Sequence, residues 1–485
     1  MSGANAEKIL SSPRLALLSK GRPLASIGSF EKPVDNIKTQ VNQLLGEVLE
    51  IARVQEPINK DDRLVERMNK ELKRRAGFIL DVATVKLVLG ENPSELIDEA
   101  TEMFPDDKYR LDGSRQIYTR AAQIVAYSGD DEKALKLAVG ACKKDIGLEV
   151  FPLRYVTEIV HELGRNIDPF LEEYQKLLDK KVNRLGGGFK SLAVDTLLRT
   201  VVSMKKIGRD TDEYMQKAEE LLQELEPKDK YIYAEYAHAQ ARLGDVKGAL
   251  ASVEKIECYG GDELSEERTQ RQKQKALRWI AHGLKQDGQL DQAFEIAEIS
   301  NDANLLIDLQ LAKALELALN DEDPVDELNK ATKLLDIEKK QKVVEVLGEH
   351  GRILLISGQE PINSFKAALV YADSHNSRYK NIEALTTIIP VISSNKELAI
   401  RAVERALDHF DKGREEKDRS INIGELQSIH VAALEAGLHR FVKQITQRLE
   451  TFKEDSLDLY NNWKPHFLLK TALIYASWLV EKEQD

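Results

Sequence analysis

Several groups of residues in this sequence carry side chains that could do chemistry, but their spacing departs from known catalytic patterns. His161-Glu162 begins like the helical zinc-protease motif, but position 165 is Arg165, so the second histidine ligand is missing. Gly186 to Gly188 lead to Lys190 as in a phosphate-binding loop, yet no glycine directly precedes that lysine. The nine histidines are scattered, and none of them stands out as a base or a metal ligand. We therefore predict no catalytic residue, no metal site and no cofactor.

Cys142 is a candidate reactive thiol, because Lys143 and Lys144 follow it and could lower its pKa if the side chains converge. An exposed basic pair usually points to solvent, so we favour a small packed residue. Cys258 is the second cysteine, and two cysteines exclude a disulfide framework and a cysteine-rich zinc module.

A basic stripe is the feature most suggestive of binding. Lys275, Arg278, His282 and Lys285 follow one another at intervals of three, four and three residues, which places them on one face of a helix. Such a stripe could bind an anionic partner, since lysine and arginine suit carboxylate or phosphate. The polar face of an amphipathic helix gives the same pattern, and both interpretations stay open.

The elements that would carry these residues are helices throughout. Apolar residues between Ile37 and Ile51 recur at intervals of three and four, and Pro57 ends that pattern. A second helix is expected from Asp61-Asp62 towards Leu89. No convincing run of alternating, β-branched residues follows, so the spacing predicts an all-α protein with an N-terminal helical pair at residues 34–93.

Downstream, one unit recurs at irregular spacing: a helix with small residues, a turn beginning with glycine, and a helix with alanine five positions after the glycine. The clearest copies have their glycine at Gly129, Gly244 and Gly288, and weaker turns follow at Gly164, Gly208, Asn320, Gly358, Ser394 and Gly437. In the three clear copies an alanine also stands seven positions before the glycine: Ala122, Ala237 and Ala281. Glycine can close the first helix in the left-handed conformation, and the alanines allow close helix packing.

These offsets resemble the tetratricopeptide-like repeats, most clearly at residues 115–140, 230–257 and 275–300. The aromatic positions and the closing proline of that family are mostly missing, which indicates a divergent relative. The resemblance implies a right-handed α-solenoid of helix-turn-helix repeats over residues 94–485, with an inner groove that holds peptides or partner proteins.

The resemblance also implies which side chains face the groove, because the family places them 13, 10, 6, 3 and 2 positions before the turn glycine. Counting back from Gly288 gives the basic stripe and Gln286. Counting back from Gly244 adds residues of the preceding repeat, among them Arg242 as a further cation. The predicted partner-binding groove therefore contains Tyr231, His238, Arg242, Lys275, Arg278, His282 and Lys285.

Composition limits the partners. The 485 residues are 42 % hydrophobic and carry a net charge of −12, so we do not expect nucleic acid to be a partner. No stretch reaches the ~20 apolar residues that span a bilayer. Residues 1–33 are rich in serine, glycine and proline and lack the apolar run of a secretory signal, which predicts a flexible arm. We predict a cytoplasmic protein, with export to another cell through this arm as the alternative.

The C-terminal segment is apolar around most of its helical circumference, from Trp463 and Phe467 to Trp478 and Leu479. It is interpreted as a helix that caps the last repeat, and self-association through this end stays open.

We expect a non-catalytic interaction protein, a scaffold, adaptor or chaperone, that binds a protein or acidic peptide in the groove. No small-molecule substrate is inferred. Two alternatives remain: an all-α enzyme with a site assembled from distant repeats, and an RNA-binding helical repeat.

Overall fold

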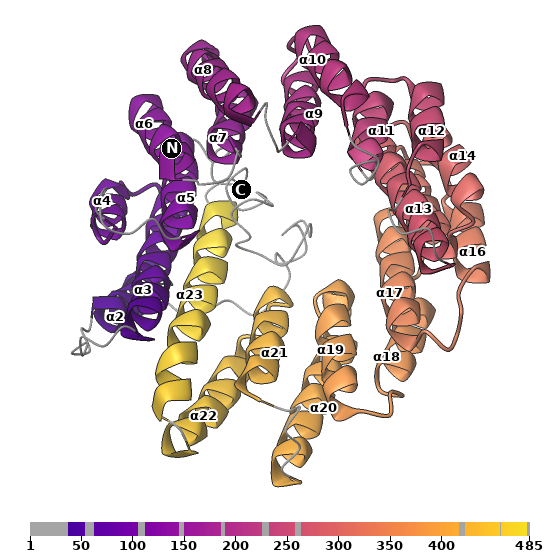
Figure 1. Cartoon of the computed structure of the whole chain (residues 1–485). Coiled ribbons are helices and arrows are strands. Elements are labelled where there is room, and N and C mark those ends of the chain that lie inside the picture. The colour runs from indigo at the N-terminus through magenta and orange to yellow at the C-terminus, as the bar shows by residue number, and fades with distance from the viewer. Residues whose placement is uncertain are drawn as a thin grey trace. The chain divides into compact units, whose positions relative to one another are not determined.

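The structure is a computed structural model that describes residues 37–53, 63–104, 112–144, 150–185, 190–225, 232–257, 263–416, 422–455 and 457–482. In these ranges the regular structure is helical and contains no strand: 22 α-helices, α2 to α23, accompany short 3-10 turns (Figure 1). The all-α prediction is confirmed. The predicted arm at 1–33, the Gly186 to Gly188 run and Cys258 lie outside the described residues.

Contacts divide the chain into two compact units. Unit 1 comprises residues 1–105 and 310–485, and unit 2 comprises residues 106–309, so the division falls inside helix α15.

Unit 2 contains most of the predicted repeats. Its helices are α5 (Asp112–Ser128), α6 (Asp131–Lys144), α7 (Phe151–Glu162), α8 (Asp168–Leu185), α9 (Lys190–Lys206), α10 (Asp212–Gln223), α11 (Tyr233–Arg242), α12 (Val246–Glu254), α13 (Glu263–Gln286), α14 (Leu290–Ser300) and the first residues of α15 (Ala303–Leu319). Each odd-numbered helix from α5 to α11 packs against the helix that follows it and against the next odd-numbered helix, and α13 packs against α14. This sequential pairwise packing is consistent with a helical repeat.

The predicted alanines explain how closely these helices pack. All six alanines at the two offsets are completely buried: Ala122, Ala237, Ala281, Ala134, Ala249 and Ala293. A methyl side chain lets two helix backbones approach, and larger residues such as Ile280 and Ile296 fill the space beside them.

The predicted turn glycines are confirmed as well. Gly244 has φ 96° and Gly288 has φ 75°, a region that residues with a Cβ rarely adopt. At Gly244 the amide donates to Ala241 O at 2.9 Å and the next amide, of Asp245, donates to Gln240 O at 2.9 Å. These two bonds satisfy carbonyls at the end of α11 and reverse the chain into α12.

Two of the weaker turns differ from the expectation. At the turn predicted near Asn320, the left-handed residue is Asp321, with φ 59°. At Ser394 the chain forms a 3-10 segment, η3 (Val391–Ser394), and Asn395 then caps α20 by accepting from Leu398 N at 3.1 Å. Aspartate can adopt the left-handed conformation without glycine. Asparagine can begin a helix by accepting a hydrogen bond from a backbone amide of its first turn.

Unit 1 joins the two ends of the sequence. Its helices are α2 (Ile37–Arg53), α3 (Arg63–Val88), α4 (Ser94–Glu102), α16 (Val325–Lys333), α17 (Lys340–Ile356), α18 (Ile362–Ala372), α19 (Arg378–Ile388), α20 (Lys396–Glu415), α21 (Ile423–Glu435), α22 (Arg440–Asp455) and α23 (Leu457–Lys482), with the last part of α15. Sequential pairs form again: α17 packs on α18, α19 on α20, and α21 on α22, while α17, α19, α21 and α23 pack in succession.

The principal partner of α2 is α23, and α3 also packs on α23 (Figure 1). Along α2 the buried residues are Ile37, Val41, Leu45, Val48 and Ala52, one apolar face of the helix. Apolar side chains of α23, among them Phe467 and Leu473, are buried in turn. The apolar C-terminal helix therefore takes its cover within the chain from a helix that begins more than 400 positions earlier in the sequence.

Candidate functional site

A recess of about 440 Å³ opens on unit 2 where four odd-numbered helices lie in succession. Its lining residues are Arg154 of α7, Leu198, Arg199 and Val202 of α9, Glu235 and His238 of α11, and Trp279, His282, Gly283 and Gln286 of α13. The volume suits one or a few side chains of a bound segment.

Several residues that line the recess stand at equivalent positions of successive repeats. Nine positions before their turn glycines stand Arg199, Glu235 and Trp279, and six positions before the same glycines stand Val202, His238 and His282. Equivalent positions of neighbouring repeats lie on the same side of parallel-stacked helices, so their side chains meet along one surface. The recess is thus a product of the repeat itself.

Gly283 allows α11 to approach α13 at the recess. A Cβ at this position would lie 2.7 Å from Arg242 Cδ and 3.0 Å from His238 Nε2. Both distances are shorter than ordinary van der Waals contact, so a side chain here would displace the arginine and the histidine. The absence of a side chain at Gly283 therefore leaves the space that His238 and Arg242 occupy.

The apolar and aromatic residues of the lining are Leu198, Val202 and Trp279. Lys275 Nζ lies 4.6 Å from the centre of the Trp279 ring, a cation–π contact. The recess therefore offers apolar surface for a side chain, with a positive charge close to Trp279.

Glu235 is the acidic group of the recess. Arg199 Nη2 lies 3.7 Å from Glu235 Oε1, while Arg199 Nε donates to Asp195 Oδ1 at 2.8 Å. Burial raises the pKa of Glu235, against the lowering effect of the Arg199 charge, and Asp195 raises it further. The carboxyl of Glu235 is therefore easier to protonate than an exposed glutamate.

His238 is held neutral. Burial lowers its pKa to about 4, and the positive charge of Arg242 acts in the same direction. At neutral pH its ring is uncharged, with one nitrogen available as a donor and the other as an acceptor.

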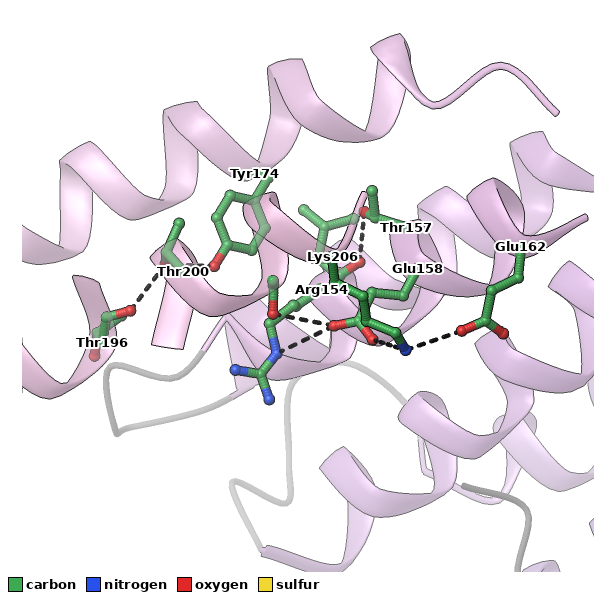
Figure 2. A network of polar contacts seen from close by, with 10 residues as sticks. Arg154, Thr157, Glu158, Glu162, Tyr174, Thr196, Thr200 and Lys206 are labelled. Carbon is green, nitrogen blue, oxygen red and sulfur yellow. Dashed lines mark hydrogen bonds and ion pairs between the residues drawn. The ribbon is translucent and has the colours of Figure 1, made fainter. Parts of the chain in front are cut away.

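Arg154 is positioned by a polar network between α7 and α9 (Figure 2). Its Nε lies 3.9 Å from Glu158 Oε1, and Glu158 in turn accepts from Ser203 Oγ at 3.0 Å and from Lys206 Nζ at 3.2 Å. Lys206 also donates to Glu162 Oε1 at 3.0 Å. The guanidinium lies over the Phe151 and Tyr155 rings, 4.5 and 5.0 Å from their centres.

A second set of hydrogen bonds joins Tyr174 of α8 to α9 (Figure 2). Its hydroxyl shares a 2.7 Å hydrogen bond with Thr200 Oγ1, and Thr200 Oγ1 donates to Thr196 O at 2.8 Å. Tyr174 is fully buried, and burial raises the pKa of its hydroxyl, so the phenol stays protonated. These bonds fix α8 against α9 and hold the α9 side chains of the recess in place.

The structure separates the predicted groove residues into two sets. His238 and His282 line the recess, and Lys275 borders it through Trp279. Arg278 instead pairs with Asp302, the residue that caps α15, and Lys285 Nζ donates to Asp308 O at 3.2 Å. These two cations connect α13 to α15.

Arg242 also has partners within unit 2. Its Nη1 donates to Gln286 Oε1 at 3.1 Å, and its Nη2 donates to Asp287 Oδ1 at 2.8 Å. A second recess of about 360 Å³ includes Arg242 with Lys205 and Lys206, but Asp287 lies there too, and Lys206 is shared with Glu158 and Glu162. Tyr231 lies outside the described residues.

Sequence reasoning missed Arg154, Arg199, Glu235 and Trp279. The available signal was the offset of nine or ten positions from the turn glycine, which these residues share across four repeats. The basic stripe is visible in the sequence because its residues lie on one helix. The recess is not, because side chains of separate helices form it.

Three other features of the sequence concern Cys142, metal binding and membrane crossing. Cys142 is buried, 1 % exposed, as the packed-residue interpretation predicts. Among the described residues no group of three or more histidine, cysteine, aspartate or glutamate side chains is arranged to hold a metal ion. None of the helices searched in the described ranges combines the length and apolar character needed to cross a membrane.

No protein-family model matches the sequence, and comparison with curated proteins finds no match either. The likeness to tetratricopeptide repeats thus rests on the residue offsets and on the paired packing of the helices.

Proposed function

We propose that this protein is a non-catalytic, solenoid-type helical-repeat protein, related in design to the tetratricopeptide-like repeats, that binds an extended segment of a partner protein. The segment lies across α7, α9, α11 and α13 and inserts a side chain into the recess of unit 2. The protein then acts as a scaffold, adaptor or chaperone.

The observation that supports this function is the register of the recess. Positions nine and six residues before successive turn glycines contribute its lining, so a ligand that follows the helices meets one equivalent position after another. An extended peptide has the same kind of linear repeat, and the mixture of Trp279, Leu198 and charged groups offers both apolar and polar contacts.

Selection from a displayed library of random peptides tests the proposal. Wild-type protein should enrich a sequence motif, and the enriched peptides should bind at least tenfold more weakly to His282→Glu and Lys275→Glu. Both side chains are exposed, so their replacement leaves the packing of α13 intact.

Arg278→Gln is the matched control, since it removes a cation of the same helix that pairs with Asp302 outside the recess. Equal loss of binding in this control would assign recognition to the α15 side of α13. Failure of the wild type to enrich any peptide would reject the peptide-binding function.

An enzyme is the second candidate, and one observation favours it. Glu235 and His238 line the same recess, with pKa values shifted in opposite directions. If they act as an acid–base pair, a peptide selected on Glu235→Gln should be converted by wild type during incubation. Mass spectrometry should show that conversion for an enzyme and an unchanged peptide for a scaffold.

A further inference from the structure

The guanidinium of Arg154 is a charged group that the described part of the chain fixes in place without using its donors. Its side chain is 13 % exposed, and no acceptor among the described residues forms a hydrogen bond with Nε. Buried polar groups nearly always have hydrogen-bond partners, and a charged donor without one costs more free energy than a neutral one.

The contacts that Arg154 does make position it. Glu158 lies at 3.9 Å, a long distance for an ion pair, and both of its oxygens already accept from Ser203 and Lys206. Phe151 and Tyr155 hold the guanidinium plane by stacking. In Figure 2 the outer nitrogens of Arg154 point away from Glu158. A rigid fork of N–H donors at the recess suits bidentate binding of a planar oxyanion.

We propose that Arg154 binds the carboxylate of an aspartate or glutamate in the bound segment, with an adjacent apolar side chain on Leu198, Val202 and Trp279. This inference rests on the proposed function, because it names the ligand side chain that the recess takes. On this proposal, the residue that binds the ligand carboxylate belongs to α7 and not to the basic stripe of α13.

The charge of the recess favours a carboxylate over a phosphate. Glu235 lies in the same recess, only 3.7 Å from Arg199, so its negative charge offsets part of the positive charge of Arg199. A dianionic phosphate would meet stronger repulsion from Glu235 than a singly charged carboxylate would.

Small probes test the site directly. Protein labelled with 5-fluorotryptophan is titrated with 3-phenylpropionate, with its neutral amide and with phenyl phosphate, and Trp279→Phe identifies the Trp279 fluorine signal. We expect a saturable shift of this signal with phenylpropionate and at least tenfold weaker binding of the amide. Tighter binding of phenyl phosphate would overturn the carboxylate assignment, and no shift with phenylpropionate would overturn the site.

Arg154→Met removes the guanidinium and keeps the aliphatic stem. We expect at least tenfold weaker phenylpropionate binding, with Arg154→Lys intermediate because an ammonium cannot bind in the same bidentate way. Arg209→Gln, which removes an exposed cation paired with Asp168, is the control and should bind like wild type. Wild-type affinity in Arg154→Met would overturn the assignment.

Thermal stability distinguishes a binding role from a structural one. Glu158 keeps Ser203 and Lys206 as partners when Arg154 is replaced, so Arg154→Met should melt at or above the wild-type temperature. A melting temperature several degrees lower would make Arg154 a structural residue and overturn the proposal. If peptides are selected but lack acidic residues, this inference fails and the proposed function stands; if none is selected, the proposed function itself fails.

Discussion

His430 shows how the structure decides the charge of a single residue. It is 1 % exposed on α21, its Nε2 shares a 2.8 Å hydrogen bond with Thr471 Oγ1 of α23, and burial lowers its pKa to about 4. The unfolded chain binds a proton near the ordinary pKa of 6.5, whereas the folded chain resists it until about 4. The free energy of unfolding therefore falls as the pH drops from 6.5 to 4.

His430→Gln should weaken that pH dependence, because glutamine stays neutral and can still bond to Thr471. The linkage amounts to ~3 kcal/mol for a shift of this size, so the variant should lose less stability than wild type by up to that amount. Urea unfolding at pH 7 and pH 4.5 measures it. Parallel losses in both proteins would show that His430 is not buried in its neutral form.

The roles of some single residues were predictable from the sequence, and those of others were not. The turn glycines and the buried alanines were found because they act within one helix hairpin, where a fixed offset in the sequence corresponds to a fixed distance in space. Arg154 and Glu235 also stand at similar offsets from their turn glycines, but these offsets do not show that the two side chains share a recess, because the recess exists only when α7, α9, α11 and α13 lie in succession.

Helix pairs are held together by their small residues. Ala249 begins the buried face of α12 and is fully covered by the core that includes Ala237, Ile280 and Leu284. No space remains there for a larger side chain, and interlocked helices cannot separate without losing their other contacts.

Ala249→Leu should lower the free energy of unfolding by about 1–3 kcal/mol, the usual cost of overpacking a filled core. Ala251→Leu adds the same bulk at an exposed position of the same helix and should leave stability nearly unchanged. Denaturant titration of both variants checks this. An unchanged midpoint for Ala249→Leu would contradict the close pairing of α11 and α12.

The basic stripe shows where prediction at the level of a single helix ends. Its spacing correctly indicates one face of α13, but that face borders two neighbours. His282 lines the recess beside α11, whereas Arg278 and Lys285 contact Asp302 and Asp308 on the side of α15. Periodicity fixes the direction of a side chain about its helix and says nothing about which element it meets.

At the scale of the whole chain, the pairing of α2 with α23 makes the first described helix part of the C-terminal repeats. Five buried residues of α2, including Val41 and Leu45, cover apolar residues that α23 would otherwise expose. Sequential repeats need a covered end, and here α2 of the same chain provides the cover.

Deletion of residues 1–53 should therefore reduce the stability of unit 1 by several kcal/mol, roughly the cost of uncovering two or more large core side chains, and promote association through α23. Deletion of residues 1–33 alone should change neither property. Urea unfolding and light scattering compare the two. A synthetic peptide of residues 34–56 should restore the stability of the variant that lacks residues 1–53. Equal stability of the two deletion variants would contradict a structural role of α2.

The sequence by itself determined the all-α class, the paired helices, the turn glycines and the alanines that pack between helices, because each depends on residues within about one hairpin. The tertiary structure alone decided that α2 covers α23, that Arg278 and Lys285 bind within unit 2, and that Arg154, Glu235 and Trp279 share a recess. These outcomes depend on distances between segments far apart in the chain. Short-range periodicity carries no information about such distances, since the packing of whole helices sets them.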